Sequence, residues 1–193
     1  MPSDDFHVHG VHDHAVEHAA GHGRVDTLDG RVAVLSALLA TLGALMTFAG
    51  GDTQAKAQLY KNSAAITKTK ANDEWGYYQA KGIKRNLAEF GASMSVKPDR
   101  IESYKAEADR YKKEQADIKD KASKLEDEVN EWDERSAHEM HVHHRWALGA
   151  TAMQISIALS AIVLLSRKTW LLYGVGAVAT GGLVFGAMAL LGL

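Results

Sequence analysis

The chain has 193 residues, with 22 Lys and Arg, 24 Asp and Glu, ten His, two Pro and no Cys. The absence of Cys excludes disulfides, thiolate metal sites and a cysteine nucleophile. A net charge of -2 gives no reason to expect nucleic-acid binding. The motifs GxxxxGKS/T, GxGxxG, HExxH and GxSxG are absent from the sequence, and no one predicted element carries a convergent set of acid, base and nucleophile. We therefore expect no enzyme and no nucleic-acid partner.

The charges are unevenly distributed along the chain. Residues 32–49, 146–165 and 170–193 contain no Asp, Glu, Lys or Arg, so every charged residue falls in the rest of the sequence. About 18 or more consecutive apolar residues are what a helix needs to cross a bilayer. The pattern therefore predicts a membrane protein with three transmembrane helices.

The predicted fold class is an all-α membrane protein, in which a long antiparallel coiled-coil helical hairpin is inserted between the first and second transmembrane helices. A break containing Pro98 lies close to the midpoint of the charged middle segment, where two helices of similar length would fold back on each other. The predicted segments are a His-rich arm at 1–31, transmembrane helices at 32–51, 146–165 and 170–193, and a stalk at 52–145.

The second stalk helix carries an apolar seam with spacings of three and four residues, which is typical of a coiled coil. The seam consists of Ile101, Tyr104, Ala108, Tyr111, Gln115, Ile118, Ala122, Leu125, Val129 and Trp132. Gln115 is the polar exception, and such a residue usually fixes register.

The first stalk helix is less regular. We expect Ala80, Ile83, Leu87 and Phe90 to face the partner helix, with Tyr78 level with Gln115. After Pro98, we expect Asp99 to be the N-cap of the second helix, with Glu102 completing a capping box.

The N-terminal arm is rich in metal-binding side chains. Imidazole binds Zn, Ni or another divalent transition metal when thiolates are absent. The candidate ligands are His7, His9, His12, His14, His18 and His22. The alternative is a polar tail whose His content is only compositional.

A second histidine cluster precedes the second transmembrane helix. Its members would share one face of a helix and are Glu134, His138, His141 and His144. They would form either a metal site or an interfacial anchor beside the lipid headgroups. No cofactor is otherwise indicated.

Two further sets of residues are candidates for contacts. Tyr77, Lys81 and Lys84 share one helix face and would bind a protein partner or remain a solvated flank. Small or amide side chains inside the apolar stretches would let transmembrane helices pack closely. These residues are Gln154, Ser156, Ser160, Gly182 and Gly186.

Three stretches of the sequence resemble the bacterial membrane-protein family known as domain-of-unknown-function family 4337. They are residues 72–81, which include the string WxYYQAK, residues 153–162 and residues 9–14. The resemblance spans nearly the whole chain. It implies a bacterial inner-membrane protein with a helical soluble insert, and it implies no activity.

These observations predict a self-associating structural or partner-binding membrane protein, in contact with lipid and with copies of itself or an unidentified protein. The alternative is a divalent-metal accessory or sensor protein that uses the His-rich arm. Arg167 and Lys168 in the short loop 166–169 predict that this loop and the N-terminus face the cytoplasm. The stalk would then be periplasmic.

Overall fold

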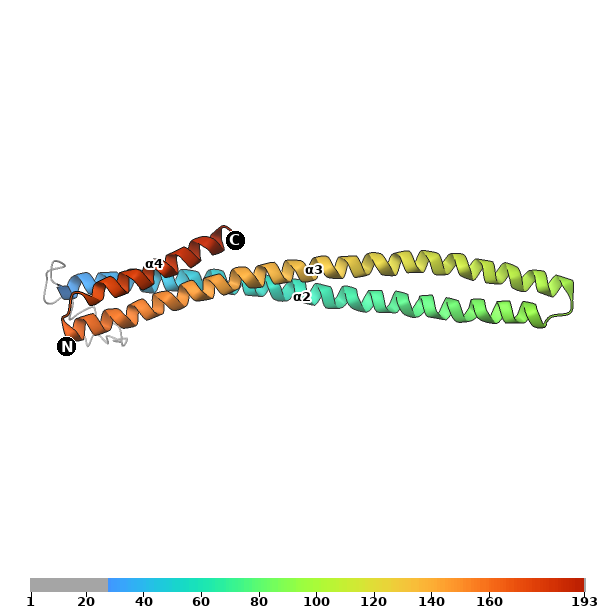
Figure 1. Cartoon of the computed structure of the whole chain (residues 1–193), viewed down its shortest axis with the longest axis horizontal. Coiled ribbons are helices and arrows are strands. Elements are labelled where there is room, and N and C mark those ends of the chain that lie inside the picture. Colours follow the sequence, from blue (N-terminus) through green and yellow to red (C-terminus); the bar gives the residue numbers. More distant parts are fainter. Residues whose placement is uncertain (1–27, 193) are drawn as a thin grey trace, which may run out of the picture. The chain divides into compact units, whose positions relative to one another are not determined.

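A computed structural model describes residues 28–192, which form three α-helices and contain no strand. The helices are α2 (Leu28–Met94), α3 (Pro98–Ser166) and α4 (Leu171–Leu190), as Figure 1 shows. Each contains a stretch long and apolar enough to cross a membrane. The all-helical class and the three long apolar helices are therefore confirmed.

The described residues divide into two compact units. The three-helix unit contains residues 28–50 of α2, residues 143–166 of α3, and α4. The helix-pair unit contains residues 51–142, which belong to α2, α3 and the turn that joins them.

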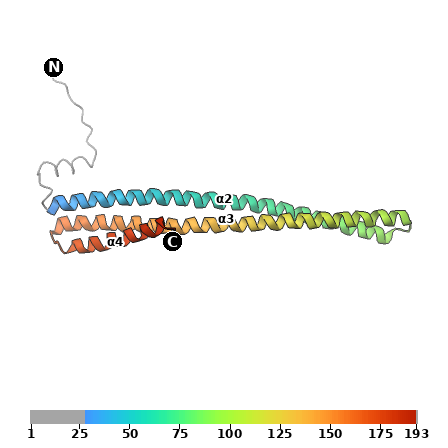
Figure 2. The same cartoon turned by 90° about the horizontal axis from the view of Figure 1, so that it is seen from above.

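The three-helix unit is held together by small and medium-sized side chains. Figures 1 and 2 both show α4 lying along the C-terminal part of α3. Met153, Val163 and Val175 are almost fully buried. Ser156 and Ser160 are buried as well, and each donates a hydrogen bond of 2.8 Å to a carbonyl four residues earlier in α3. Their polar atoms are thus satisfied inside an apolar core.

Gly182 marks the closest approach between α3 and α4. A Cβ atom at this position would lie 2.9 Å from Ala152 Cβ and from Met153 Cε, and 3.1 Å from the carbonyl oxygen of Gly149. A Cβ atom at Gly186 would lie 2.7 Å from Met46 Cε. These two glycines therefore pack helices of the same chain against each other, as small residues do in membrane-protein interiors.

We predict that Gly182→Ala lowers the free energy of unfolding of the three-helix unit by about 1–3 kcal/mol, because the added methyl group overpacks the α3–α4 contact. Gly181→Ala is the matched control, since a Cβ atom there has no neighbour within 4 Å. Thermal unfolding in detergent, followed by circular dichroism, measures the difference. Equal unfolding temperatures for the two variants would contradict the prediction.

In the helix-pair unit, α2 and α3 run antiparallel. Ser136 Oγ donates a hydrogen bond of 2.8 Å to the carbonyl of Ala57, and Gln115 Nε2 donates one of 3.1 Å to the carbonyl of Tyr78. From the first contact to the second, α2 advances from Ala57 to Tyr78 while α3 runs back by the same distance, from Ser136 to Gln115. Figures 1 and 2 show the two helices side by side along this unit.

The inner face of α3 is the one that the sequence predicted. All ten seam residues are buried or half-buried, with Ala108, Gln115, Ala122 and Val129 the most enclosed. Tyr78 lies level with Gln115, as expected. The inner face of α2 consists mainly of short side chains, including Thr53, Ala57, Ala64, Thr67, Ala71 and Ala88.

The predicted inner stripe of α2 is wrong. Ala80, Ile83, Leu87 and Phe90 are exposed and face away from α3. The helix is rotated so that Gly82, Arg85 and Ala88, which are short or form polar contacts, turn inward.

The N-cap prediction at the turn is also wrong. Helix α3 begins at Pro98, and the carbonyl of Lys97 accepts hydrogen bonds of 3.1 Å from the amides of Arg100 and Ile101. Lys97 is therefore the cap residue, and Pro98 takes the first helical position, where its missing N–H costs nothing. Asp99 lies one residue further into the first turn, where its negative charge interacts favourably with the helix dipole.

Candidate functional site

The most prominent unoccupied surface of the helix-pair unit is a row of large apolar side chains on α2, which we call the outer stripe. Its members are Ile83, Leu87, Phe90 and Met94, which are 68%, 68%, 61% and 69% exposed. The spacings of four, three and four residues are those of a coiled-coil seam. The stripe therefore has the geometry that fits another helix.

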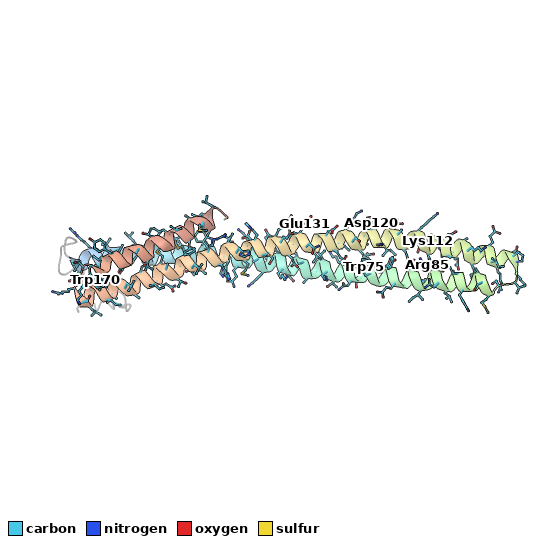
Figure 3. All side chains as sticks on the ribbon, in the orientation of Figure 1. Trp75, Arg85, Lys112, Asp120, Glu131 and Trp170 are labelled. Carbon is cyan, nitrogen blue, oxygen red and sulfur yellow. The ribbon has the colours of Figure 1, made fainter. Side chains whose placement is uncertain are left out.

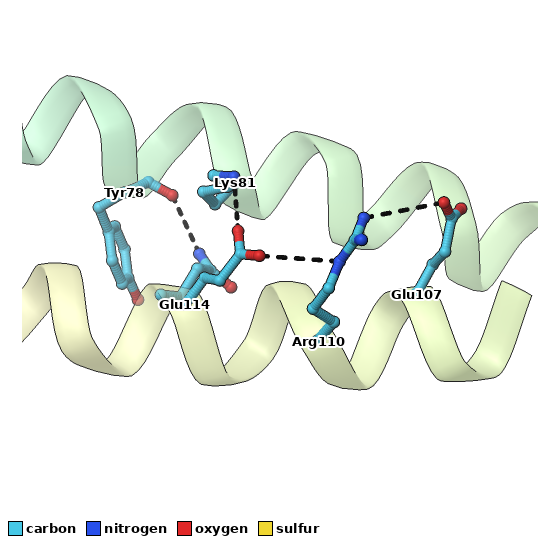
Figure 4. Close-up of polar contacts among 6 residues, drawn as sticks. Tyr78, Lys81, Glu107, Arg110 and Glu114 are labelled. Atoms are coloured by element: carbon cyan, nitrogen blue, oxygen red, sulfur yellow. Dashed lines mark hydrogen bonds and ion pairs between the residues drawn. The ribbon is translucent and has the colours of Figure 1, made fainter.

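A polar cluster around Gln115 fixes the rotation that leaves these side chains on the outside of the pair. Figure 4 shows its neighbours Tyr78, Lys81, Glu114 and Arg110. Gln115 is buried; its amide donates to the Tyr78 carbonyl, and its side-chain oxygen accepts a hydrogen bond of 3.1 Å from Arg85. A Cβ atom at Gly82 would lie only 2.8 Å from Gln115 Nε2. A side chain at position 82 would therefore displace the Gln115 amide from the position in which it makes these hydrogen bonds.

Charged side chains extend the cluster along the edge of the helix pair. Lys81 forms an ion pair with Glu114, which also pairs with Arg110 at 3.7 Å. The Lys81 ammonium also lies 5.4 Å from the ring centroid of Tyr111. Trp75 donates a hydrogen bond of 3.0 Å to Glu126 further along. These cross-helix contacts specify one rotation and one register of α2 against α3.

The hydrogen bond from Lys81, together with the charges of Lys81 and Arg110, lowers the pKa of the Glu114 carboxyl below its ordinary value. A carboxyl with a lowered pKa stabilises the folded state above its unfolded pKa. That contribution is lost as the pH falls through the folded pKa, which here lies below the ordinary value of a glutamate carboxyl. The cross-helix pair is therefore intact throughout the neutral range.

We predict that Lys81→Met raises the pKa of Glu114 toward the ordinary value of a glutamate carboxyl, because it removes the hydrogen bond and the nearest positive charge. Titration of the carboxyl carbon by NMR measures the change. Lys84→Met is the control, since Lys84 is exposed and contributes least among the groups that lower this pKa. An unchanged pKa in Lys81→Met would contradict the assignment.

The structure separates the three residues that the sequence grouped as a partner-binding face. Lys81 is held within the helix pair by Glu114, whereas Tyr77 is 61% exposed and Lys84 is also exposed. Figure 3 labels Lys112 and Asp120 on α3, and both are exposed. Within the helix-pair unit, the large exposed apolar side chains of the two helices lie almost entirely on α2.

The predicted metal ligands of the N-terminal arm, His7, His9, His12, His14, His18 and His22, lie outside the described residues. In the second cluster, Glu134, His138, His141 and His144 are all exposed on α3. Over residues 28–192, no three His, Asp or Glu side chains are grouped so that they could hold a metal ion. The structure thus gives no support to a metal site at this cluster.

The neighbouring His143 makes a different contact. Its Nδ1 lies 2.8 Å from the carbonyl oxygen of Gly50 in α2. A Cβ atom at Gly50 would lie 3.1 Å from Trp146 Cβ. This histidine therefore contributes to helix packing within the three-helix unit.

The predicted packing residues of the apolar stretches divide into two groups. Ser156, Ser160, Gly182 and Gly186 are buried between helices of the chain. Gln154 is exposed on α3. The first four are thus used inside the monomer, and Gln154 is left on its surface.

These features define an all-helical protein with three long helices, each of which contains an apolar stretch, and with a charged antiparallel pair formed by two of them. A family model described as "Domain of unknown function (DUF4337)" matches residues 28–192, so the chain belongs to this family. The resemblance inferred from the sequence is thereby confirmed. No curated protein and no solved structure matches the chain.

Proposed function

We propose that this protein is a self-associating scaffold of the bacterial inner membrane, anchored by the three-helix unit and joined to further copies through the outer stripe. The observation that carries the proposal is the row of Ile83, Leu87, Phe90 and Met94 on the face of α2 turned away from α3. Such a row in water is a site for another helix.

The surface of the three-helix unit supports the membrane location. Large apolar side chains are exposed on all three of its helices. They include Leu38, Leu45 and Phe48 on α2, Leu148, Ile155 and Leu165 on α3, and Tyr173, Leu183 and Leu190 on α4. A helix bundle that is apolar all round is suited to hydrocarbon and would aggregate in water.

The short turn between α3 and α4 supports an orientation. Arg167 and Lys168 lie in it, and Arg167 has a φ of 51°, a left-handed conformation that most side chains disfavour. Positive residues in short loops favour the cytoplasmic side. We therefore assign this turn to the cytoplasm and the helix pair to the periplasm.

We predict that alkaline phosphatase inserted after Val96, in the turn of the helix pair, is active in intact cells, because the enzyme folds only outside the cytoplasm. The same reporter inserted after Lys168 is the control and is expected to be inactive. The reverse pattern would overturn the assigned orientation and leave the membrane location standing.

The composition of the outer stripe favours a second copy as its occupant. Gln79, Asn86 and Ser93 flank the stripe, and Lys84 is the one charged residue at the flanking positions. Two copies can therefore pair without like-charge repulsion. Burying each large apolar side chain contributes roughly 1.5–3 kcal/mol, so four from each copy are enough to offset part of the entropic cost of association.

The absence of native Cys allows a direct test of this contact. Copies inserted in the same orientation around a twofold axis bring Leu87 next to Leu87 of the neighbouring copy. We predict that Leu87→Cys forms a reducible dimer in membranes under mild oxidation. Lys112→Cys, at an exposed position of α3, is the matched control and should remain monomeric on a gel.

A second substitution tests whether the stripe itself brings the copies together. Adding Ile83→Glu to Leu87→Cys should reduce the dimer band at least tenfold, because it places a charge in the apolar contact. Equal cross-linking of Leu87→Cys and Lys112→Cys would show random collision and overturn the proposed use of the stripe.

A further inference from the structure

Gln154 is a polar residue in an apolar setting. It is the ninth residue of the uncharged stretch 146–165, about 12 Å along the helix from Trp146 at 1.5 Å per residue. The three uncharged stretches contain no other Asn or Gln and no His. Within residues 28–192 its exposed side chain has no hydrogen-bond partner.

Unlike Gln154, exposed threonines of the three-helix unit form hydrogen bonds within their own helices. Thr41, Thr151 and Thr180 each donate a hydrogen bond of 2.8–2.9 Å to the carbonyl four residues earlier in the same helix. The Gln154 amide has two N–H donors and an acceptor oxygen, and none of them is used in this way. In hydrocarbon, an unpaired amide is costly and favours association of helices.

We propose that Gln154 pairs with Gln154 of a second copy of this chain, and that this amide pair lies at the centre of a dimer contact between α3 helices. The inference rests on the proposed membrane location, but it is independent of the outer stripe. An amide is self-complementary, because the NH2 group of each copy can donate to the oxygen of the other around a twofold axis. No other residue of the apolar stretches offers an amide partner at this depth.

The surroundings of Gln154 suit a close approach of two helices. Positions at spacings of three and four residues on the same face of α3 are all exposed, and most of their side chains are short. They are Ala147, Thr151, Ala158, Ala161 and Leu165. By contrast, Gly182 and Gly186 are already buried within the chain and cannot serve a second copy. The α3 face is therefore one of the small-residue surfaces that remain available, and it is the one that carries an amide side chain.

The test measures association of the full-length chain in phosphatidylcholine vesicles. Fluorescence energy transfer between chains labelled at Lys168→Cys reports the dimer, and Leu87→Glu in every chain removes the contribution of the outer stripe. We expect Gln154→Leu to weaken dimerisation about tenfold, which is the effect of losing two amide hydrogen bonds in a membrane. Gln154→Asn should restore part of it. Thr180→Val is the matched control and should leave dimerisation unchanged.

The outcomes separate this inference from the proposed function. Unchanged energy transfer in Gln154→Leu, or a monomeric parent chain, would overturn the amide pair. In a separate single-cysteine chain, protection of Ala158→Cys from a water-soluble maleimide would show that the membrane location holds. Labelling of that cysteine in sealed vesicles would overturn the membrane location and with it the inference. A cross-link from Ala158→Cys to a different protein in cells would overturn the second copy as occupant.

Discussion

The buried amide of Gln115 determines which face of α2 meets α3. It donates to the Tyr78 carbonyl, accepts from Arg85, and occupies the space that a side chain at residue 82 would fill. A polar group in this position needs its partners, because leaving a buried donor or acceptor unpaired costs about 1–3 kcal/mol. The rotation that satisfies Gln115 is the one that turns the outer stripe away from α3.

Close packing in the three-helix unit has a parallel consequence. Gly149 and Gly182 bring α3 and α4 together, and Met46 packs against Gly149 and Gly186. With its glycines and serines on the inside, α3 directs Gln154 outward. In both units, small or polar contacts within one chain leave a surface that is better suited to a further helix than to its present surroundings.

The fold was largely accessible from the sequence, because periodicity and charge report directly on burial. The seam of α3 is regular over its whole length, and the structure buries or half-buries each of its residues. On α2 two phases compete: one carries large residues such as Leu87, and the other carries Ala64, Ala71 and Ala88. Hydrophobicity favours the first, so it is the phase that the sequence predicts. The pairing of Arg85 and Lys81 with α3 is visible only in three dimensions.

The candidate sites were less predictable for a related reason. Small residues in an apolar stretch indicate a close contact, but they do not reveal whether the neighbouring helix belongs to the same chain. Ser156 and Gly182 proved to be internal, and Gln154 external. The ion pair of Lys81 could not be predicted either, because its partner Glu114 lies on the other helix, beyond the turn at Pro98 and far away in the sequence.

The free energies of apolar burial and of polar pairing explain why a single chain cannot satisfy both faces of α2. Facing Ile83, Leu87 and Phe90 toward α3 would contribute roughly 1.5–3 kcal/mol for each side chain, while it would leave Gln115 and its charged neighbours without partners. The two free-energy contributions are of similar size, and the arrangement within one chain pairs the polar groups around Gln115 but leaves the large apolar side chains exposed. In the proposed assembly, a neighbouring copy on the outer stripe would bury these apolar side chains as well, without disturbing the Gln115 cluster. Association through this face would therefore let one sequence use both of its heptad phases.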